Sequence, residues 1–152
     1  MSPSPAAPAF GPRVRPFLIA AGVLTLAFAV PLVQWVSFGL RSYLYSHIVL
    51  IPAVSGWLIW TRRAHTPTER RAGRLPAIAL AILSAIALAY GLVVQPDPVL
   101  EPHHRLTWTI AAYVLALVAA GFALLGTPAV RTHAVALAFL VFMIPMPGWL
   151  ER

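Results

Sequence analysis

The sequence has no cysteine and few charged residues. Of its 152 residues, 10% are charged and 60% are hydrophobic. Without Cys, these residues form no disulfide, no thiolate metal site and no cysteine nucleophile. Soluble domains are nearer half apolar and a quarter charged, and disordered chains have low hydrophobicity. The composition therefore excludes a soluble domain and a mostly disordered chain, and it predicts an integral membrane protein.

Lysine is also absent, so the net charge of +7 comes from 11 Arg set against 4 acidic residues. A basic balance of this size is compatible with nucleic acid as a partner. However, most of the Arg lie in short clusters between apolar runs, which is the pattern that sets membrane topology. We therefore expect the lipid bilayer as a partner and no nucleic acid.

Long apolar runs define the architecture. A helix needs about 20 apolar residues to cross the hydrocarbon core, and unpaired backbone is not tolerated in lipid. Five apolar runs are close enough to this length to be predicted as membrane spans. They lie near residues 17–36, 43–60, 75–94, 106–125 and 132–150. We predict an all-α, polytopic membrane helical bundle of about five transmembrane helices, in which Pro145 and Pro147 end the last helix near Ile144.

The N-terminal segment and the Arg distribution give the orientation. Residues 1–16 hold five Pro and are predicted to be a disordered cytoplasmic tail. Ala27 to Ala29 resembles a signal-peptide cleavage site, but the apolar run continues to Val36, so we expect an uncleaved helix. With a cytoplasmic N-terminus, the inside segments hold eight Arg (Arg13, Arg15, Arg62, Arg63, Arg70, Arg71, Arg74, Arg131) and the outside segments three (Arg41, Arg105, Arg152). This bias follows the positive-inside rule.

Two further patterns concern packing. Ala77, Ala81, Ala85 and Ala89 recur every four residues, and small residues let helices approach closely in lipid. We expect this stripe to pack on another helix. The five Trp lie at or near span ends, where their rings favour the membrane interface: Trp35, Trp57, Trp60, Trp108 and Trp149.

Ionisable groups inside spans are costly and are default functional candidates. His47 is the leading functional candidate, and it has Ser46 next to it and Tyr43 on the same helical face. It is either a proton carrier or substrate contact at the outer surface, or an interfacial His bonded to a neighbouring helix or to water. A single His lacks the partners that define a catalytic site.

The other polar residues offer weaker patterns. Asp97, Glu101, His103 and His104 carry metal-binding groups, but their spacing matches no defined ligand motif, so a solvated loop is favoured over a metal site. His133 is expected at the membrane interface. Ser55 lies in no nucleophile motif and is expected to bond its own helix backbone. We predict no cofactor and no metal.

Two segments together resemble the exosortase/archaeosortase (EpsH-like) family of multi-spanning membrane proteins. The first is Tyr45-Ser46-His47, followed by an apolar run that ends in a basic pair at residues 62–63. The second is FLVFMIPMPGWL, residues 139–150, with Pro145 and Pro147. One departure from the family pattern is Ile48, where Gly is common.

The resemblance implies a bacterial inner-membrane enzyme, a cysteine protease or transpeptidase, that cuts and transfers the C-terminal sorting tails of exported proteins, often alongside exopolysaccharide production. The family's Cys, Arg and His lie on spans beyond the Pro-x-Pro stretch, so no catalytic residue is carried over to this chain. Residues 17–152 are expected to be the N-terminal part of such an enzyme, truncated before the catalytic half and inactive alone. The alternative is a non-enzymatic membrane subunit, such as a transporter or assembly component.

Overall fold

The regular elements of the protein are helices throughout the part of the chain that the computed structural model describes, residues 14–41, 50–62, 73–94 and 104–144. They are α1 (Val14–Ala27), α2 (Ala29–Arg41), α3 (Leu50–Thr61), α4 (Arg74–Val93), α5 (His104–Leu124), α6 (Thr127–Thr132), α7 (Ala134–Phe139) and the 3-10 helix η3 (Leu140–Met143). The predicted all-α class is confirmed.

The helices differ in whether they are long enough to cross a bilayer. Among the described residues α4 and α5 are long and apolar enough, and α1 with α2 makes a third candidate if this bent pair counts as one span. These three correspond to the first, third and fourth predicted runs. Helix α3 and the helical stretch 134–143 are shorter apolar helices. The rest of the second and fifth runs, residues 43–49 and 145–150, lies outside the described residues.

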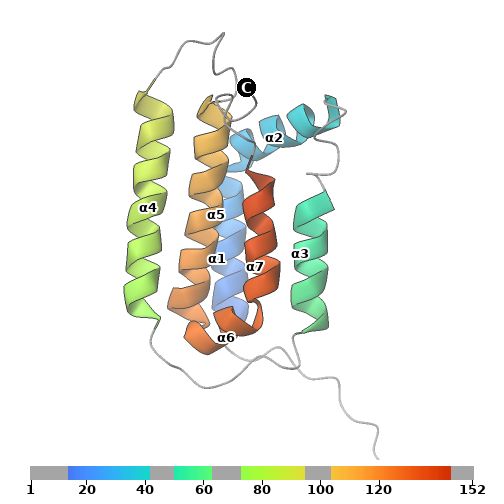
Figure 1. Ribbon diagram of the computed structural model, residues 1–152, viewed down its shortest axis with the longest axis vertical. Coiled ribbons are helices and arrows are strands. Elements are labelled where there is room, and N and C mark those ends of the chain that lie inside the picture. Colours follow the sequence, from blue (N-terminus) through green and yellow to red (C-terminus); the bar gives the residue numbers. More distant parts are fainter. Residues whose placement is uncertain (1–13, 42–49, 63–72, 95–103, 145–152) are drawn as a thin grey trace, which may run out of the picture.

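A bend of 73° separates α1 from α2. Pro31 explains it, because proline has no N–H for the carbonyl of Ala27 four residues earlier, and its ring clashes with that carbonyl. The hydrogen bonds resume on both sides, from the Phe28 amide to Leu24 O at 2.9 Å and from the Leu32 amide to Phe28 O at 3.0 Å. As a result α2 crosses the upper end of the bundle in Figure 1.

The helices alternate in direction. In Figure 1, α1, α4 and α7 run upward, and α3 and α5 run downward. We define the upper end of the bundle as the one where α4 ends at Val93 and α5 begins at His104. Helix α3 ends and α4 begins at the opposite, lower end. This alternation agrees with repeated crossings, and the Arg distribution predicts that the lower end is cytoplasmic and the upper end faces outward.

Helices α4 and α5 pack against each other along their length. The buried face of α4 carries the small residues Ala77, Ser84, Ala87 and Gly91. The Ser84 hydroxyl donates a hydrogen bond to the Ala112 carbonyl at 2.7 Å. A Cβ on Gly91 would lie 2.7 Å from Cβ of Trp108, so the absence of a side chain there allows the close approach of the two helices.

Among the described residues, only one of the four members of the predicted alanine stripe is buried against another helix, and packing of the other three on a helix outside the described residues stays a prediction. Ala77 is buried, but Ala81, Ala85 and Ala89 are exposed. In a helix of 3.6 residues per turn, each four-residue step turns the side-chain direction by about 40° beyond a full turn. Residues spaced strictly four apart therefore rotate away from any single face of the helix after a few steps. The residues that pack include Ala77, Ser84 and Gly91, and their seven-residue spacing drifts by only about 20° per step.

Candidate functional site

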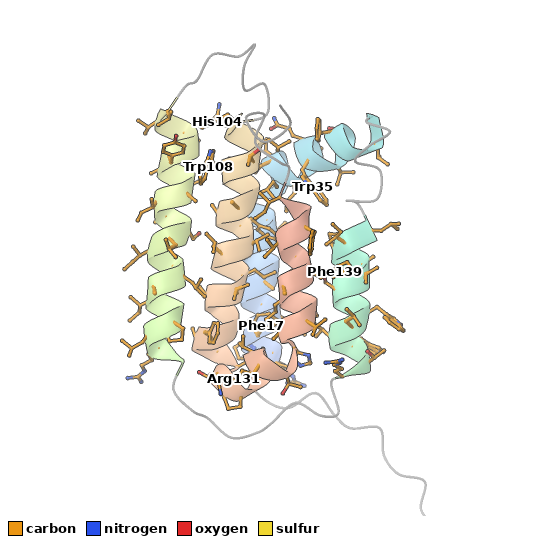
Figure 2. The ribbon with its side chains drawn as sticks, in the orientation of Figure 1. Phe17, Trp35, His104, Trp108, Arg131 and Phe139 are labelled. Atoms are coloured by element: carbon orange, nitrogen blue, oxygen red, sulfur yellow. The ribbon has the colours of Figure 1, made fainter. Side chains whose placement is uncertain are left out.

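A buried cluster joins four helices in the upper half of the bundle. Its members, here called the Trp35 cluster, are Trp35, Ile51, Ile110, Val114, Leu140 and Met143. They come from α2, α3, α5 and η3. Trp35 was predicted at the membrane interface, yet only 2% of it is exposed. Figure 2 shows Trp35 where α2 crosses near the upper end of the red helix that contains α7.

The cluster contains a hydrogen bond between segments far apart in sequence. The indole Nε1 of Trp35 donates to the carbonyl of Met143 at 2.8 Å, and both residues are buried. The next residue, Ile144, is extended, with φ −76° and ψ 118°, and its amide donates to Val141 O at 3.1 Å. The predicted end of the last helix near Ile144 is therefore confirmed, and α2 holds that end through Trp35.

The family-motif positions themselves, Tyr45, Ser46, His47, Pro145 and Pro147, lie outside the described residues, so their contacts stay a prediction. The helix ends that adjoin them are described. Helix α3 begins at Leu50 and packs against α7 and η3, and η3 ends at Met143. The start of α3 and the end of η3, which adjoin the two motifs in sequence, therefore lie at the same upper end of the bundle, at the Trp35 cluster. This convergence defines the candidate site.

A second group of side chains lies at the upper ends of α4 and α5. The ring centroid of Tyr90 is 5.3 Å from that of His104 and 4.8 Å from that of Trp108. His104 was expected in a solvated loop, which is wrong: it begins α5 and is 8% exposed, because its ring packs beside these two aromatic rings. Figure 2 shows His104 and Trp108 on α5, near the upper end of α4.

The metal site that the sequence analysis considered would also need Asp97, Glu101 and His103 as ligands. These three residues lie outside the described residues. Within the described ranges no group of three His, Cys, Asp or Glu side chains is placed to hold a metal ion. His104 therefore acts as a packing residue of the α4–α5 pair in the part of the chain that the structure describes.

Two other polar candidates are buried. His133, expected at the membrane interface, is 6% exposed at the junction of α6 and α7. Ser55 is 2% exposed, and its hydroxyl has no hydrogen-bond partner among the described residues, so the expected bond to its own helix backbone was wrong. A serine nucleophile needs both access to substrate and a base within hydrogen-bond reach. Ser55 as described has neither.

A groove of about 470 Å³ lies beside α1, α4 and α5. Its walls are mainly alanine: Ala77, Ala81, Ala116, Ala119, Ala120 and Ala123. Among the described lining residues, the only hydroxyl belongs to Ser84, which is already bonded to Ala112 O. The described part of its lining therefore offers no acid or base and no free nucleophile.

Comparison with known proteins gives one match. Residues 35–152, well over half of the chain, match a family model described as transmembrane exosortase. No curated protein and no solved structure matches. The matched region begins at Trp35 and includes the whole Trp35 cluster, both motif-bearing segments and the α4–α5 pair. Sequence inspection assigned Trp35 to the membrane interface and missed its place in this buried cluster.

Proposed function

This chain belongs to the transmembrane exosortase family, and on that basis we propose that it takes part in processing the C-terminal sorting tails of exported proteins. Such a tail consists of a short recognition motif, an apolar span and a basic end. The proposed place is the outer face of a bacterial inner membrane, where the apolar span of an exported protein holds the cleavage region close to the bilayer.

The observation that carries the proposal is the convergence at the upper end. Ile51 at the start of α3 and Met143 at the end of η3, each close in sequence to a family motif, both belong to the Trp35 cluster. The Arg distribution assigns this same end to the outside. A substrate that arrives by export presents its recognition motif on that side. We therefore propose that the segments containing His47 and Pro145 to Pro147 contact the tail.

The residues present indicate which steps of tail processing this sequence can carry out: binding of the tail, or its cutting and transfer. A thioester route needs a thiolate activated by a neighbouring base or cation, and residues 1–152 contain no Cys. The buried Ser55 hydroxyl is no substitute. We propose that these residues bind and orient the tail, and that the nucleophile comes from residues outside this sequence. The cutting or transfer step is therefore not assigned to any residue here.

Photo-cross-linking tests the proposal. A benzophenone amino acid replaces Leu50, which is 62% exposed at the upper end of α3, or Leu75, which is 84% exposed at the lower end of α4. An exported protein with an intact tail should cross-link from position 50 several-fold more than one whose recognition motif is scrambled but whose span and basic end are kept. Position 75 should show no dependence on the motif. Equal yields for both tails at position 50 would refute tail recognition here.

A second function, a non-enzymatic membrane subunit, is favoured by one observation, the absence of Cys from these residues. In that case the bundle packs against partner helices. Cross-linking should then be equal for an intact tail and a scrambled one. The same experiment separates the two functions, because only tail processing predicts that cross-linking depends on the recognition motif.

A further inference from the structure

Two contacts between α1 and α5 set the depth of α1 in the bundle. The Thr25 hydroxyl, which donates to Ala21 O at 2.8 Å, lies 3.0 Å from the Tyr113 hydroxyl. Nearer the lower end, a Cβ on Gly121 would lie 3.9 Å from a ring carbon of Phe17. Both contacts give the same antiparallel register, because Phe17 and Thr25 are as far apart in sequence as Tyr113 and Gly121.

This register places the bend between α1 and α2 below the upper end of α5. Phe28 lies at the bend, three residues beyond Thr25, so it is level with Ile110, three residues before Tyr113. The ring centroids of Phe28 and Tyr113 are 5.6 Å apart, in agreement with this level. Helix α5 begins at His104, six residues before Ile110, so the bend lies about 9 Å below the upper end of α5.

The lengths of α4 and α5 relate this depth to the bilayer. The two helices have 20 and 21 residues, so each is about 30 Å long, which is also the thickness of the hydrocarbon core. Their upper ends therefore mark its upper boundary. Helix α2 has 13 residues and leaves α1 at 73°, so it rises by only about 6 Å. It stays below the boundary and lies across the bundle beside the upper turns of α5 (Figure 1).

The exposed side of α2 is apolar. Val30, Val33 and Leu40 are each 68% or 69% exposed. The Ser37 hydroxyl is bonded to carbonyls of its own helix, those of Val33 at 3.0 Å and Gln34 at 2.9 Å. A groove of about 330 Å³ runs along this side and is lined by Leu32, Val33, Val36, Ser37 and Leu40. At the depth of α2, lipid acyl chains are the partner that such a surface fits.

We propose that α2 is an in-plane helix of the outer leaflet and that lipid acyl chains cover its exposed side. Interfacial helices are buried by about 5–10 Å, and α2 runs from about 9 Å below the boundary at the bend to about 3 Å at its far end. The first predicted run is therefore not one straight crossing. The Trp35 cluster, which includes Ile110, lies inside the leaflet. This inference goes beyond tail processing and does not depend on it.

Depth measurements on single-cysteine variants test this placement. Because the chain has no native Cys, a bimane fluorophore can be attached to Val33→Cys or Leu40→Cys in reconstituted vesicles. Lipids with a nitroxide near the headgroup or deep in the acyl chain quench it according to depth. The two positions are about 10 Å apart along the helix, but the 73° bend leaves a depth difference of about 3 Å. The shallow nitroxide should quench both more strongly.

The matched control is a pair with the same spacing on a crossing helix. Leu75→Cys and Ile82→Cys replace exposed residues of α4, and their depths should differ by about 10 Å. A difference that large between Val33→Cys and Leu40→Cys would show that α2 continues straight along α1, and it would overturn the proposal. Absence of lipid quenching at both α2 positions would also overturn it, because water or another helix would then cover α2.

Val30→Cys gives a third position on the exposed side of α2 if a labelled variant loses its helical circular dichroism signal. It should lie slightly deeper than Val33→Cys, because it is nearer the bend. No tail is present in these vesicles, so the result is independent of the cross-linking experiment. Nearly equal depths on α2 together with motif-independent cross-linking from position 50 would refute tail recognition and leave the placement of α2 intact.

Discussion

Residues 1–152, produced alone in a bacterial membrane, will leave a co-produced exported protein with a sorting tail entirely uncut. The physical reason is the lack of a usable nucleophile. No Cys is present to form a thiolate, and the hydroxyl of Ser55 is buried without a base as partner among the described residues. Immunoblots that distinguish full-length from shortened substrate measure the outcome.

The control for that experiment is the same tailed protein produced with a cysteine-containing exosortase, which must shorten it. A second control contains the tailed protein alone and reports cleavage by host proteases. Shortened substrate that appears with residues 1–152 and not in the second control would show that a nucleophile other than Cys operates within these residues, and it would contradict the division of labour proposed above.

The second large effect is expected at Gly91. A Cβ there would lie 2.7 Å from Cβ of Trp108, closer than two carbon atoms pack. Gly91→Val adds three carbons at this point, so α4 and α5 must separate. Overpacking a tight contact costs about 3 kcal/mol, which corresponds to a fall in Tm of about 10 °C for a chain of this size. Thermal melts followed by circular dichroism in detergent measure it.

Gly56 provides the matched control for the Gly91 substitution. It is also helical, in α3, but nothing lies within 4 Å of the position that its Cβ would occupy. Gly56→Ala should leave Tm unchanged or raise it slightly, because Ala loses less conformational freedom in a helix than Gly does. If Gly91→Val melts at the same temperature as the unsubstituted chain, the close α4–α5 approach is wrong.

Length and hydropathy predict the parts of this fold that depend on local sequence. The runs 75–94 and 106–125 appear as α4 and α5 because a long uncharged run leaves the backbone no alternative to helix in lipid. The end of helical structure at Met143 also follows from sequence, since Pro145 and Pro147 remove donors from the next turn. These features need no knowledge of tertiary contacts.

The features that the sequence did not predict, the burial of Trp35 and of His104, depend on tertiary contacts. A Trp near a span end is ordinarily an interfacial residue, and Trp35 becomes a core residue only because α2 bends across η3. The sequence carried no signal for this contact, because the acceptor of the Trp35 indole is a backbone carbonyl, that of Met143. His104 is similar: its neighbours along the chain indicate a polar loop, but Tyr90 on α4 provides an apolar surface for its ring.

The central claim is that the described helix ends next to the two family motifs, the start of α3 and the end of η3, lie together at the end of the bundle that we propose faces outward. Because the chain has no native Cys, paired substitutions Leu50→Cys and Ile144→Cys introduce its only thiols. A short, membrane-impermeant bis-thiol reagent added to intact spheroplasts should join them, whereas Leu50→Cys with Leu124→Cys, at opposite ends, should not be joined. Failure to link Leu50→Cys with Ile144→Cys, or linkage only when the reagent has access to the cytoplasmic face, would contradict the account.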